Sequence, residues 1–380
     1  MGGRLLKIQT IGFPKMYAQG EKRDFLPELF GKLSEFSHIN IYIERDYGKG
    51  MGLCHQDYLN ENSNLKFVSH YEAYEQDLVV VLKAPEEAAI NQMKEGSALI
   101  SMLHYDTRPK RNQLLKSKRL VCYSMDSMVD DRENRMVVNF WGTAMSGARA
   151  AFNKLKKTMK DFYSTERKPI NVSIIGFGNL GISAVRAFSK LSYEEFKDIK
   201  AAGILVKILS RSITRDFEAL KSILTKTDIL VDASRRGDSC KVIVPNELIA
   251  YMPDHSIILD LTADPYDHRV KPICQKGIEG IPTGNLNHYI IEKDDKLYES
   301  IPREVDKRNR RVVVSCNAWP GVYPVESMKV YGNQIYPFIS VLLEKDPSLL
   351  SMDSHNSYER ALLRSSLDFY FKGISHMKAH

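Results

Sequence analysis

Cysteine is scarce in this chain, and the spacing of its cysteines excludes the common cysteine-based sites. The five residues are odd in number, lie far apart and form no C-x-x-C pair. This pattern argues against a disulfide framework or a zinc site and suits a reducing cytosol. They are Cys54, Cys122, Cys240, Cys274 and Cys316. The opening sequence, MGGRLLKIQTIGF, lacks the apolar core and cleavage site of a signal peptide, so we expect a cytoplasmic protein.

Long hydrophobic runs and long blocks of one charge are also absent. No uninterrupted apolar stretch is long enough to span a membrane. The formal net charge of +7 is mild for 380 residues, and the densest basic stretches, 110–119 and 303–311, are short. Each favours a solvated face or an anionic cofactor or substrate over nucleic acid, because no zinc-finger spacing or stacked-aromatic RNA motif is present. We therefore expect small-molecule substrates as partners, and neither nucleic acid nor membrane.

The composition is that of a globular chain with room for two domains. Hydrophobic residues make up 43% and charged residues 27% of 380 residues, which is too long for one ordinary core. From residue 171 to about 320, short apolar β-branched segments alternate with helical ones, which predicts a parallel sheet covered by helices on both faces. The strands expected after the first lie at 205–211, 228–234, 256–264 and 311–318. Residues 1–140 also contain strands and helices, residues 145–164 have helical periodicity, and the C-terminal stretch is helical.

A glycine-rich segment, GFGNLG, separates one expected strand from one expected helix. The apolar run 172–175 precedes it, and a helix with one apolar face follows over 182–191. In such a unit the first glycine permits a tight turn, the second lets a pyrophosphate approach, and the third lets helix and strand pack. The free N–H groups at the helix start would receive the anion. The predicted cofactor-binding residues are Gly176, Gly178, Asn179, Leu180 and Gly181. The alternative is a strand–turn–helix unit that binds nothing, and the order of elements disfavours it.

The end of the next strand bears on which nucleotide is bound. An acidic residue there accepts hydrogen bonds from the ribose 2′-hydroxyl of NAD, whereas an arginine accommodates the 2′-phosphate of NADP. The strand ends in Ser210, Arg211 and Ser212, with Arg215 close behind and no acid before Asp216. Positive charge and hydroxyl donors suit a phosphate, so NADP(H) is favoured and NAD(H) stays open.

Four longer segments, in order along the chain, resemble one family of dehydrogenases. The segment IGFPKMYAQGEKRDFLPE resembles the family's opening strand with the loop and the arginine that follow it. The segment VVVLKAPEEAAINQMKEGSALISMLHYDT resembles the family's strand with a lysine followed by its strand with a histidine. The family's bridge into the nucleotide domain is similar to NRMVVNFWGTAMSGARAA, and its return to the first domain is similar to CNAWPGVYPVESMKVYGNQIYPFI. The family contains alanine dehydrogenase, lysine-forming saccharopine dehydrogenase, carboxyethylornithine synthase and the nucleotide-binding part of proton-pumping transhydrogenase.

This resemblance implies a fold and a division into domains. The expected class is α/β, with a Rossmann dinucleotide-binding domain inserted in a discontinuous Rossmann-like catalytic domain. The catalytic domain is expected to comprise residues 1–140 plus 320–380, and the NAD(P)-binding domain residues 141–319. Family members form homo-oligomers, although no exposed apolar stripe in the sequence identifies an interface.

The resemblance also implies a substrate site. Lys83 and His104 match the family's acid–base pair, and Arg23 matches the arginine that holds a substrate carboxylate. Arg135 matches an arginine that lies near the carboxylates of the longer substrate in the saccharopine enzyme. From the residues alone, Lys83 could instead reach solvent and His104 could be a core histidine. Tyr105 either flanks the substrate or covers the sheet edge.

In the nucleotide domain, the resemblance places acids near the cofactor. Asp260 and Asp264 match acidic positions at a strand end that faces the nicotinamide. This chain departs from alanine dehydrogenases at one position. They have an asparagine where this chain has Ala318, and the asparagine of this chain, Asn317, stands one residue earlier. That difference argues against alanine itself as the substrate.

The predicted reaction is an NAD(P)-dependent reductive condensation of a 2-oxo acid with an amino acid, or its reverse, as in opine and saccharopine dehydrogenases. Such chemistry needs groups that move protons near neutral pH, and histidine or a buried lysine beside other cations can do so. An arginine fork fixes a carboxylate. Two alternatives stay open: oxidative deamination with ammonia, as in alanine dehydrogenase, and a nucleotide-binding sensor without catalysis. The presence of both Lys83 and His104 disfavours the sensor.

Overall fold

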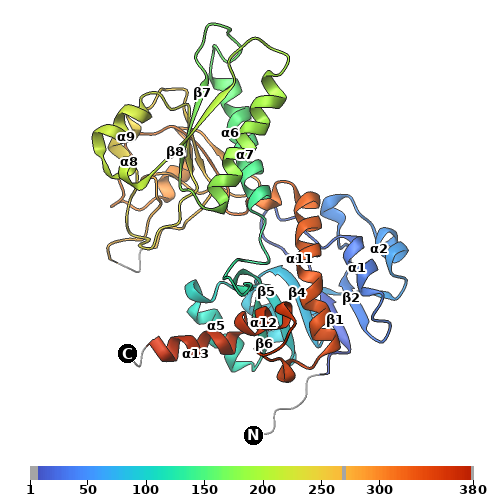
Figure 1. Ribbon diagram of the computed structural model, residues 1–380. Coiled ribbons are helices and arrows are strands. Elements are labelled where there is room, and N and C mark those ends of the chain that lie inside the picture. The colour runs from blue at the N-terminus through green and yellow to red at the C-terminus, as the bar shows by residue number, and fades with distance from the viewer. Residues whose placement is uncertain (1–6, 268–270, 378–380) are drawn as a thin grey trace. The chain divides into compact units, whose positions relative to one another are not determined.

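The protein forms two compact units in a computed structural model. The structure describes residues 7–267 and 271–377 (Figure 1). The first unit comprises Met1–Asn139 and Pro324–His380, and the second comprises Phe140–Tyr323. Each unit has its own sheet and its own hydrophobic core. Within the part of the chain that the structure describes, no helix combines the length and the apolar character needed to cross a membrane.

The first unit is built on a six-stranded sheet whose neighbouring strands run parallel. The strands are β1 (Thr10–Phe13), β2 (Asn40–Glu44), β3 (Leu65–Val68), β4 (Leu78–Lys83), β5 (Ala98–Met102) and β6 (Val121–Ser124). Their spatial order is β3-β2-β1-β4-β5-β6, so the order along the chain reverses between β1 and β4. In β4 alternate residues enter two different hydrophobic clusters, which is the pattern of a strand buried on both faces.

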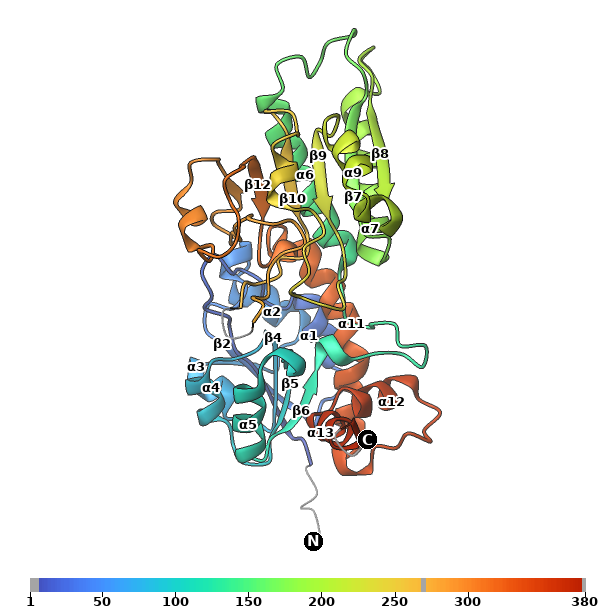
Figure 2. The ribbon, with the colours of Figure 1, turned by 90° about the vertical axis from the view of Figure 1, so that its left-hand side faces the viewer.

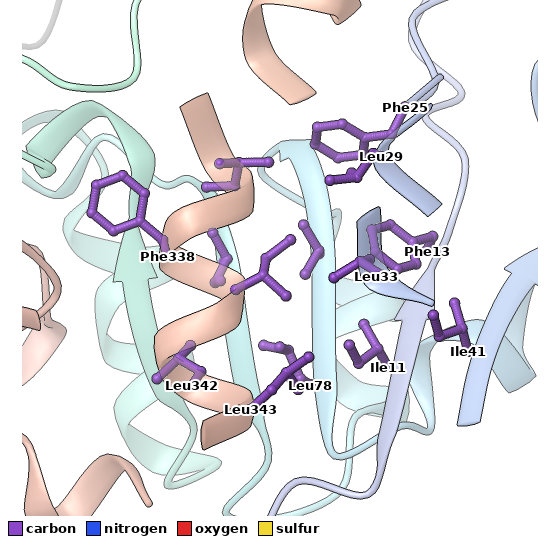
Figure 3. Close-up of a cluster of buried hydrophobic side chains, with 14 of the residues drawn as sticks. Ile11, Phe13, Phe25, Leu29, Leu33, Ile41, Leu78, Phe338, Leu342 and Leu343 are labelled. Carbon is purple, nitrogen blue, oxygen red and sulfur yellow. The ribbon is translucent and has the colours of Figure 1, made fainter. Parts of the chain in front are cut away.

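Helices cover both faces of this sheet. They are α1 (Pro27–Leu33), α2 (His55–Glu61), α3 (His70–Tyr74), α4 (Glu87–Gln92), α5 (Pro109–Ser117), α11 (Pro324–Glu344), α12 (Ser357–Arg364) and α13 (Leu367–Met377). Figure 3 shows the cluster under α1 and α11, where Leu29 and Leu342 face the sheet residues Ile11 and Leu78. Helices α3, α4 and α5 follow one another on the other face (Figure 2). The C-terminal segment therefore completes the core of the N-terminal sheet.

The second unit has a sheet of the same kind, with one short addition. Its order is β11-β12-β10-β9-β7-β8. The parallel strands are β7 (Ile170–Ile175), β8 (Ile204–Leu209), β9 (Ile229–Asp232), β10 (Ile257–Asp260) and β12 (Val312–Ser315). The two-residue β11 (Ile290–Ile291) pairs antiparallel with β12 at the edge, which the sequence does not predict. Strand order reverses between β7 and β9, as in a doubly wound dinucleotide-binding domain.

Two hydrophobic clusters cover the faces of the second sheet. Its helices are α6 (Phe140–Thr158), α7 (Asn179–Phe196), α8 (Arg211–Arg215), α9 (Phe217–Leu224) and α10 (Asn246–Ile249). Helices α6 and α7 pack side by side on one face, where Phe152 and Phe188 share a cluster. On the other face α9 and α10 contribute Leu224 and Leu248. Both units are thus α/β, as expected from the sequence.

Candidate functional site

Four adjacent strands of the first sheet end in one row, and the predicted catalytic residues lie at those ends. Lys83 is the last residue of β4, and His104 follows β5 by two residues. Glu21 and Arg23 lie in the loop after β1, and Asp126 follows β6. Because β1, β4, β5 and β6 are neighbours and parallel, these ends form one edge, next to the point where strand order reverses. Ligands of open α/β sheets bind at this edge.

Glu21 joins Arg23 and Lys83 through one buried carboxylate. Its Oε1 accepts a hydrogen bond from Arg23 Nε at 2.7 Å, and its Oε2 accepts one from Arg23 Nη2 at 2.6 Å. Lys83 Nζ lies 2.9 Å from the same Oε2. Burial opposes ionisation, yet the hydrogen bond and charge of Arg23 and the charge of Lys83 lower the pKa of Glu21 to about 2. An ionised Glu21 therefore holds both cations in place.

This arrangement refines what the sequence predicts for the two cations. Arg23 is buried and gives two of its three nitrogens to Glu21, while its Nη1 makes no hydrogen bond to the described residues. The Lys83 side chain is 34% exposed. The sequence suggests a buried lysine beside other cations, whereas the Lys83 amino group pairs with the Glu21 carboxylate. Sequence reasoning missed Glu21, although it stands two residues before Arg23 in the same charged loop.

His104 is exposed and oriented by an acid from the neighbouring strand. Its Nδ1 lies 3.4 Å from Asp126 Oδ2, and its backbone N–H donates to Asp126 Oδ1 at 3.2 Å. The Ser124 hydroxyl donates to that same Oδ1 at 2.7 Å. Burial raises the pKa of Asp126, but the hydrogen bond and charge of His104 outweigh it and lower the value to about 2. The side chain of His104 is 54% exposed, so it is not a core histidine.

The backbone at His104 is unusual as well. Its φ of 51° places it in the left-handed region, which residues other than glycine seldom adopt. Such conformations persist where surrounding contacts fix them, and they cluster at functional sites. Here the two bonds to Asp126 supply that constraint. Asp126 was missed from the sequence because it is 22 positions away.

Arg135 lies near the same group of charges. The buried Tyr331 of α11 has its pKa raised by burial, and the charges of Arg23 and Arg135 both counteract that rise. Both arginines are therefore close enough to one phenol to act on it. Arg135 donates to the Val137 carbonyl at 3.4 Å and forms no ion pair with the described residues. Its positive charge is thus not neutralised by an internal carboxylate.

Tyr105 has a structural position that differs from its predicted role. The residue begins a short 3-10 turn, Tyr105–Thr107, which directs its ring into the core, where it is 3% exposed. Its hydroxyl donates to the Cys122 carbonyl at 3.2 Å, and its ring packs against Tyr370 of α13. This burial is at odds with the predicted substrate-binding role and matches the alternative, in which Tyr105 covers the sheet edge.

A second candidate region lies at the carboxyl edge of the other sheet. A cavity of about 730 Å³ opens there, lined in part by Gly176, Gly178, Ser210, Arg211 and Arg236. These residues follow β7, β8 and β9, which are neighbours in the sheet. The cavity therefore lies where doubly wound folds hold a nucleotide.

The glycine loop fits a nicotinamide dinucleotide. Gly176 has a φ of 102°, and a Cβ there would lie 2.5 Å from the Ala233 carbonyl oxygen. A Cβ on Gly181 would lie 2.1 Å from the Gly176 carbonyl oxygen, so helix and loop pack too closely for any side chain. A Cβ on Gly178 would instead meet no atom within 4 Å. Gly178 is the N-cap of α7, so open space lies before the first N–H groups, from Asn179 and Leu180 onward.

The segment after β8 exposes hydroxyls and cations together. Ser210 caps α8 by accepting from the Ile213 N–H at 3.4 Å, and its Oγ lies 2.7 Å from Ser212 Oγ. Arg211 and Arg215 are exposed, line the cavity and form no ion pair with the described residues. This is the chemistry that a phosphate group on the ribose requires.

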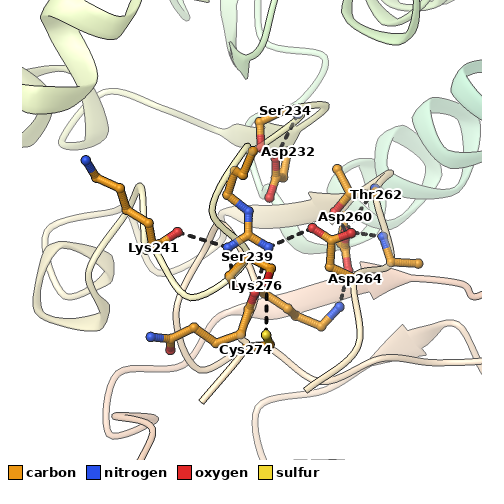
Figure 4. Close-up of polar contacts among 12 residues, drawn as sticks. Asp232, Ser234, Ser239, Lys241, Asp260, Thr262, Asp264, Cys274 and Lys276 are labelled. Atoms are coloured by element: carbon orange, nitrogen blue, oxygen red, sulfur yellow. Dashed lines mark hydrogen bonds and ion pairs between the residues drawn. The ribbon is translucent and has the colours of Figure 1, made fainter. Parts of the chain in front are cut away.

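The two acids predicted to face the nicotinamide, whose polar contacts Figure 4 shows, differ in burial. Asp260 is 1% exposed, and its Oδ2 pairs with the equally buried Lys276 at 2.6 Å and accepts from the Ser315 hydroxyl at 2.9 Å. This burial is at odds with direct cofactor contact by Asp260, which instead anchors the strand end. Asp264 is 42% exposed, and its Oδ2 accepts from Arg236 Nη2 at 2.7 Å. Sequence reasoning did not anticipate Lys276 or Arg236.

Each of the two units is an α/β unit built on a mainly parallel sheet, and one of them has a glycine loop that fits a dinucleotide. This fold defines a two-domain Rossmann-like protein. Residues 14–141 match the family described as alanine dehydrogenase/PNT, N-terminal domain. This match, the relatives below and the fold support the predicted resemblance to the alanine dehydrogenase-like superfamily.

Most of the chain aligns with known relatives, although the sequence identity is low. The chain is 21% identical over 388 residues to the NAD(P) transhydrogenase subunit alpha of Haemophilus influenzae, covering 93% of this chain and 69% of the relative. It is 25% identical over 318 residues to alanine dehydrogenase 1 of Staphylococcus aureus, covering 76% of this chain and 80% of the relative.

Solved structures show the same fold. An L-alanine dehydrogenase superposes with a TM-score of 0.69 at 18% identity, covering 94% of each chain. A transhydrogenase from Sinorhizobium meliloti gives 0.63 at 14% identity, covering 88% of this chain and 94% of the other. The predicted fold class is confirmed, and the relatives support the prediction of an oxidoreductase, one that acts on CH–NH2 bonds. The opine or saccharopine type and the preference for NADP stay predictions.

Proposed function

We propose that this protein is an NADP(H)-dependent dehydrogenase that reductively joins a 2-oxo acid to an amino acid, or oxidises the product back. The observation that carries the proposal is the charge arrangement on the first unit. Lys83 and His104 are each held by an acid, and Arg135 is a further cation that has no acidic partner in the part of the chain that the structure describes. A product of this class carries two carboxylates, so it needs a second arginine, whereas alanine does not.

Lys83 and His104 would move the protons of the reaction. Joining an amine to a carbonyl carbon removes a proton from the nitrogen and delivers protons to the carbonyl oxygen, which leaves as water. An amino group and an imidazole are both groups that can donate and accept protons when they are positioned beside the reacting atoms. Glu21 and Asp126 position them. A bound nicotinamide cofactor supplies the hydride.

Arginines would hold the two carboxylates. Arg23 offers Nη1 to the carboxylate of the oxo acid, next to the partly exposed Lys83. Arg135 would take the carboxylate of the amino acid that supplies the nitrogen. Residues 1–140 and 320–380 would then form the substrate domain, and residues 141–319 the nucleotide domain.

The preference for NADP(H) over NAD(H) is supported by the loop after β8. Ser210, Arg211 and Arg215 line the cavity with a hydroxyl and two cations, and Ser212 lies beside Ser210. The ribose 2′-phosphate would neutralise them, while the 2′-hydroxyl of NAD would leave them unpaired. Five free thiols are consistent with a cytoplasmic location.

A nicotinamide absorbance assay tests this function. Purified protein is given NADPH or NADH with pyruvate or 2-oxoglutarate, and with ammonia, lysine or ornithine as the amine. We expect turnover that requires the amino acid and is faster with NADPH, and we expect R135Q to raise KM for the amino acid roughly tenfold. Turnover with ammonia alone would instead indicate deamination of the alanine dehydrogenase type.

A further inference from the structure

Two cysteines that are 34 positions apart in the sequence meet beside the nucleotide cavity. Cys240 Sγ and Cys274 Sγ lie 3.6 Å apart, and both side chains are half-buried. Cys240 Sγ donates to the Pro272 carbonyl at 3.1 Å, and the Ser239 hydroxyl lies 2.9 Å from Cys274 Sγ. Each thiol is therefore held in a defined direction, facing the other.

The loops that carry these thiols also hold a residue that lines the cavity. Ser239 and Lys241 flank the first cysteine in the sequence. Arg236 Nη1 donates to their carbonyls, at 3.2 and 2.9 Å respectively. Arg236 Nη2 donates at 2.6 Å to the carbonyl of Gln275, the residue that follows the second cysteine. The side chains of Arg236 and Lys241 both line the cavity. A change at the thiol pair is thus transmitted directly to the cavity wall.

We propose that Cys240 and Cys274 form a reversible disulfide that weakens nucleotide binding when a peroxide oxidises the pair. One thiolate attacks the peroxide oxygen, becomes a sulfenic acid and releases water. The second thiol attacks that sulfur, the S–S bond forms, and a second water leaves with the proton. The two cysteines lose two electrons and two protons, and the peroxide is reduced. The effect on binding rests on the proposed nucleotide function of this cavity.

The geometry permits this bond and predicts its effect. A disulfide has its sulfurs about 2.05 Å apart, so the two sulfur atoms must approach by roughly 1.5 Å, which shifts the side chains and the loops that carry them. A disulfide sulfur has no proton, so the bond from Cys240 to the Pro272 carbonyl is lost. The carbonyls of Ser239 and Lys241 move with Cys240, which disturbs the two hydrogen bonds that Arg236 donates to them. We expect the Kd for NADPH to rise roughly three- to tenfold.

The reaction should become faster as pH rises. Desolvation and the hydrogen bond with Cys274 raise the pKa of the Cys240 thiol. The thiolate is the attacking species, so a raised pKa makes oxidation slow at neutral pH and faster toward about pH 9.

The test uses the full-length protein with hydrogen peroxide as the probe. Non-reducing peptide mapping after native alkylation identifies linked cysteines, and fluorescence titration gives the Kd for NADPH before oxidation, after it and after dithiothreitol. We expect a peptide linking Cys240 to Cys274, a raised Kd and its recovery on reduction. C240S and C274S should keep the Kd of the reduced protein in peroxide, while the matched control C54S, at an exposed cysteine, should respond like the wild type.

Three other outcomes would each contradict one part of the proposal. Free or separately over-oxidised thiols without a linked peptide would overturn the disulfide. A linked peptide with an unchanged Kd would overturn its effect on binding. A reduced protein that binds neither NADPH nor NADH would contradict the proposed function, and the mapped peptide would still decide whether the thiols pair.

Discussion

The two candidate regions treat charge in opposite ways. At the edge of the first sheet, the amino group of Lys83 and the imidazole of His104 each have an acidic partner. Around the cavity of the second unit, Arg211 and Arg215 have none among the described residues. Groups that act on a substrate must be held in place beforehand, whereas cations that meet an anionic ligand must be left available for it. On the proposed function, the first region would carry the chemistry and the second would bind the cofactor.

The same contrast extends to what holds each region together. Breaking a buried ion pair leaves a charge without a partner and is strongly destabilising. The glycine loop of the second unit depends instead on backbone conformation and on the absence of side chains. Substitutions in the first region should therefore affect turnover and stability, and substitutions around the cavity should affect cofactor binding.

The largest effect is expected from K83M. Removing the proton carrier should lower kcat by roughly a hundredfold to ten-thousandfold, since general acid–base groups contribute that much. The Kd for NADPH should stay within about twofold, because Lys83 belongs to the other unit. Steady-state kinetics and fluorescence titration measure the two quantities. K110M, at an exposed lysine of α5, is the matched control, and full activity of K83M would refute the catalytic assignment.

G178A separates binding from stability in the second region. Gly178 has a φ of −84°, which alanine adopts readily, and its Cβ would enter the space reserved for the pyrophosphate. We expect the Kd for NADPH to rise roughly tenfold or more with an unchanged Tm. G176A, whose Cβ would strike the Ala233 carbonyl, should lower Tm as well. An unchanged Kd in G178A would show that the dinucleotide does not approach this glycine.

R211Q sharpens the choice of nucleotide. Loss of a charged donor to the ribose phosphate should raise the Kd for NADPH about tenfold and leave that for NADH unchanged. Titration of both nucleotides gives the ratio directly. R186Q, at an exposed arginine of α7, should change neither. Equal loss of affinity for both nucleotides would exclude a specific contact with the 2′-phosphate.

The last prediction concerns the pH dependence of stability. The pKa of Glu21 falls from 4.5 to about 2 on folding, so the stabilisation is complete above pH 4.5 and is lost as pH falls toward 2. This group should contribute about 3 kcal/mol to that pH dependence. Urea unfolding between pH 6 and pH 3 should show a shallower loss of stability in E21Q than in the wild type. The exposed E35Q should follow the wild type, and equal slopes for E21Q would contradict the buried ion network.

The residues of the site that stand in a clear local sequence pattern could be predicted from the sequence. Lys83 and the glycine loop lie at the ends of short apolar runs, and parallel strands bring such ends to one edge. The strand β3 escaped prediction because its sequence, LKFV, is short and carries a lysine, and β11 has only two residues.

The partners of these residues could not be predicted. Asp126 and Lys276 reach His104 and Asp260 across 22 and 16 positions, through loops whose paths no periodicity encodes. The sequence left two positions open for Tyr105, beside the substrate or over the sheet edge, and the 3-10 turn after His104 directs its ring into the core. The sequence thus indicates which chemistry is present, and the folded loops decide which groups meet.

The most direct test of the proposed function is the mass of the product formed from NADPH, pyruvate and ornithine, with ammonia also present. We expect a secondary amine that contains the carbon skeletons of both pyruvate and ornithine, and K83M should not form it. Alanine as the sole product would contradict the opine-type assignment and identify ammonia as the amine.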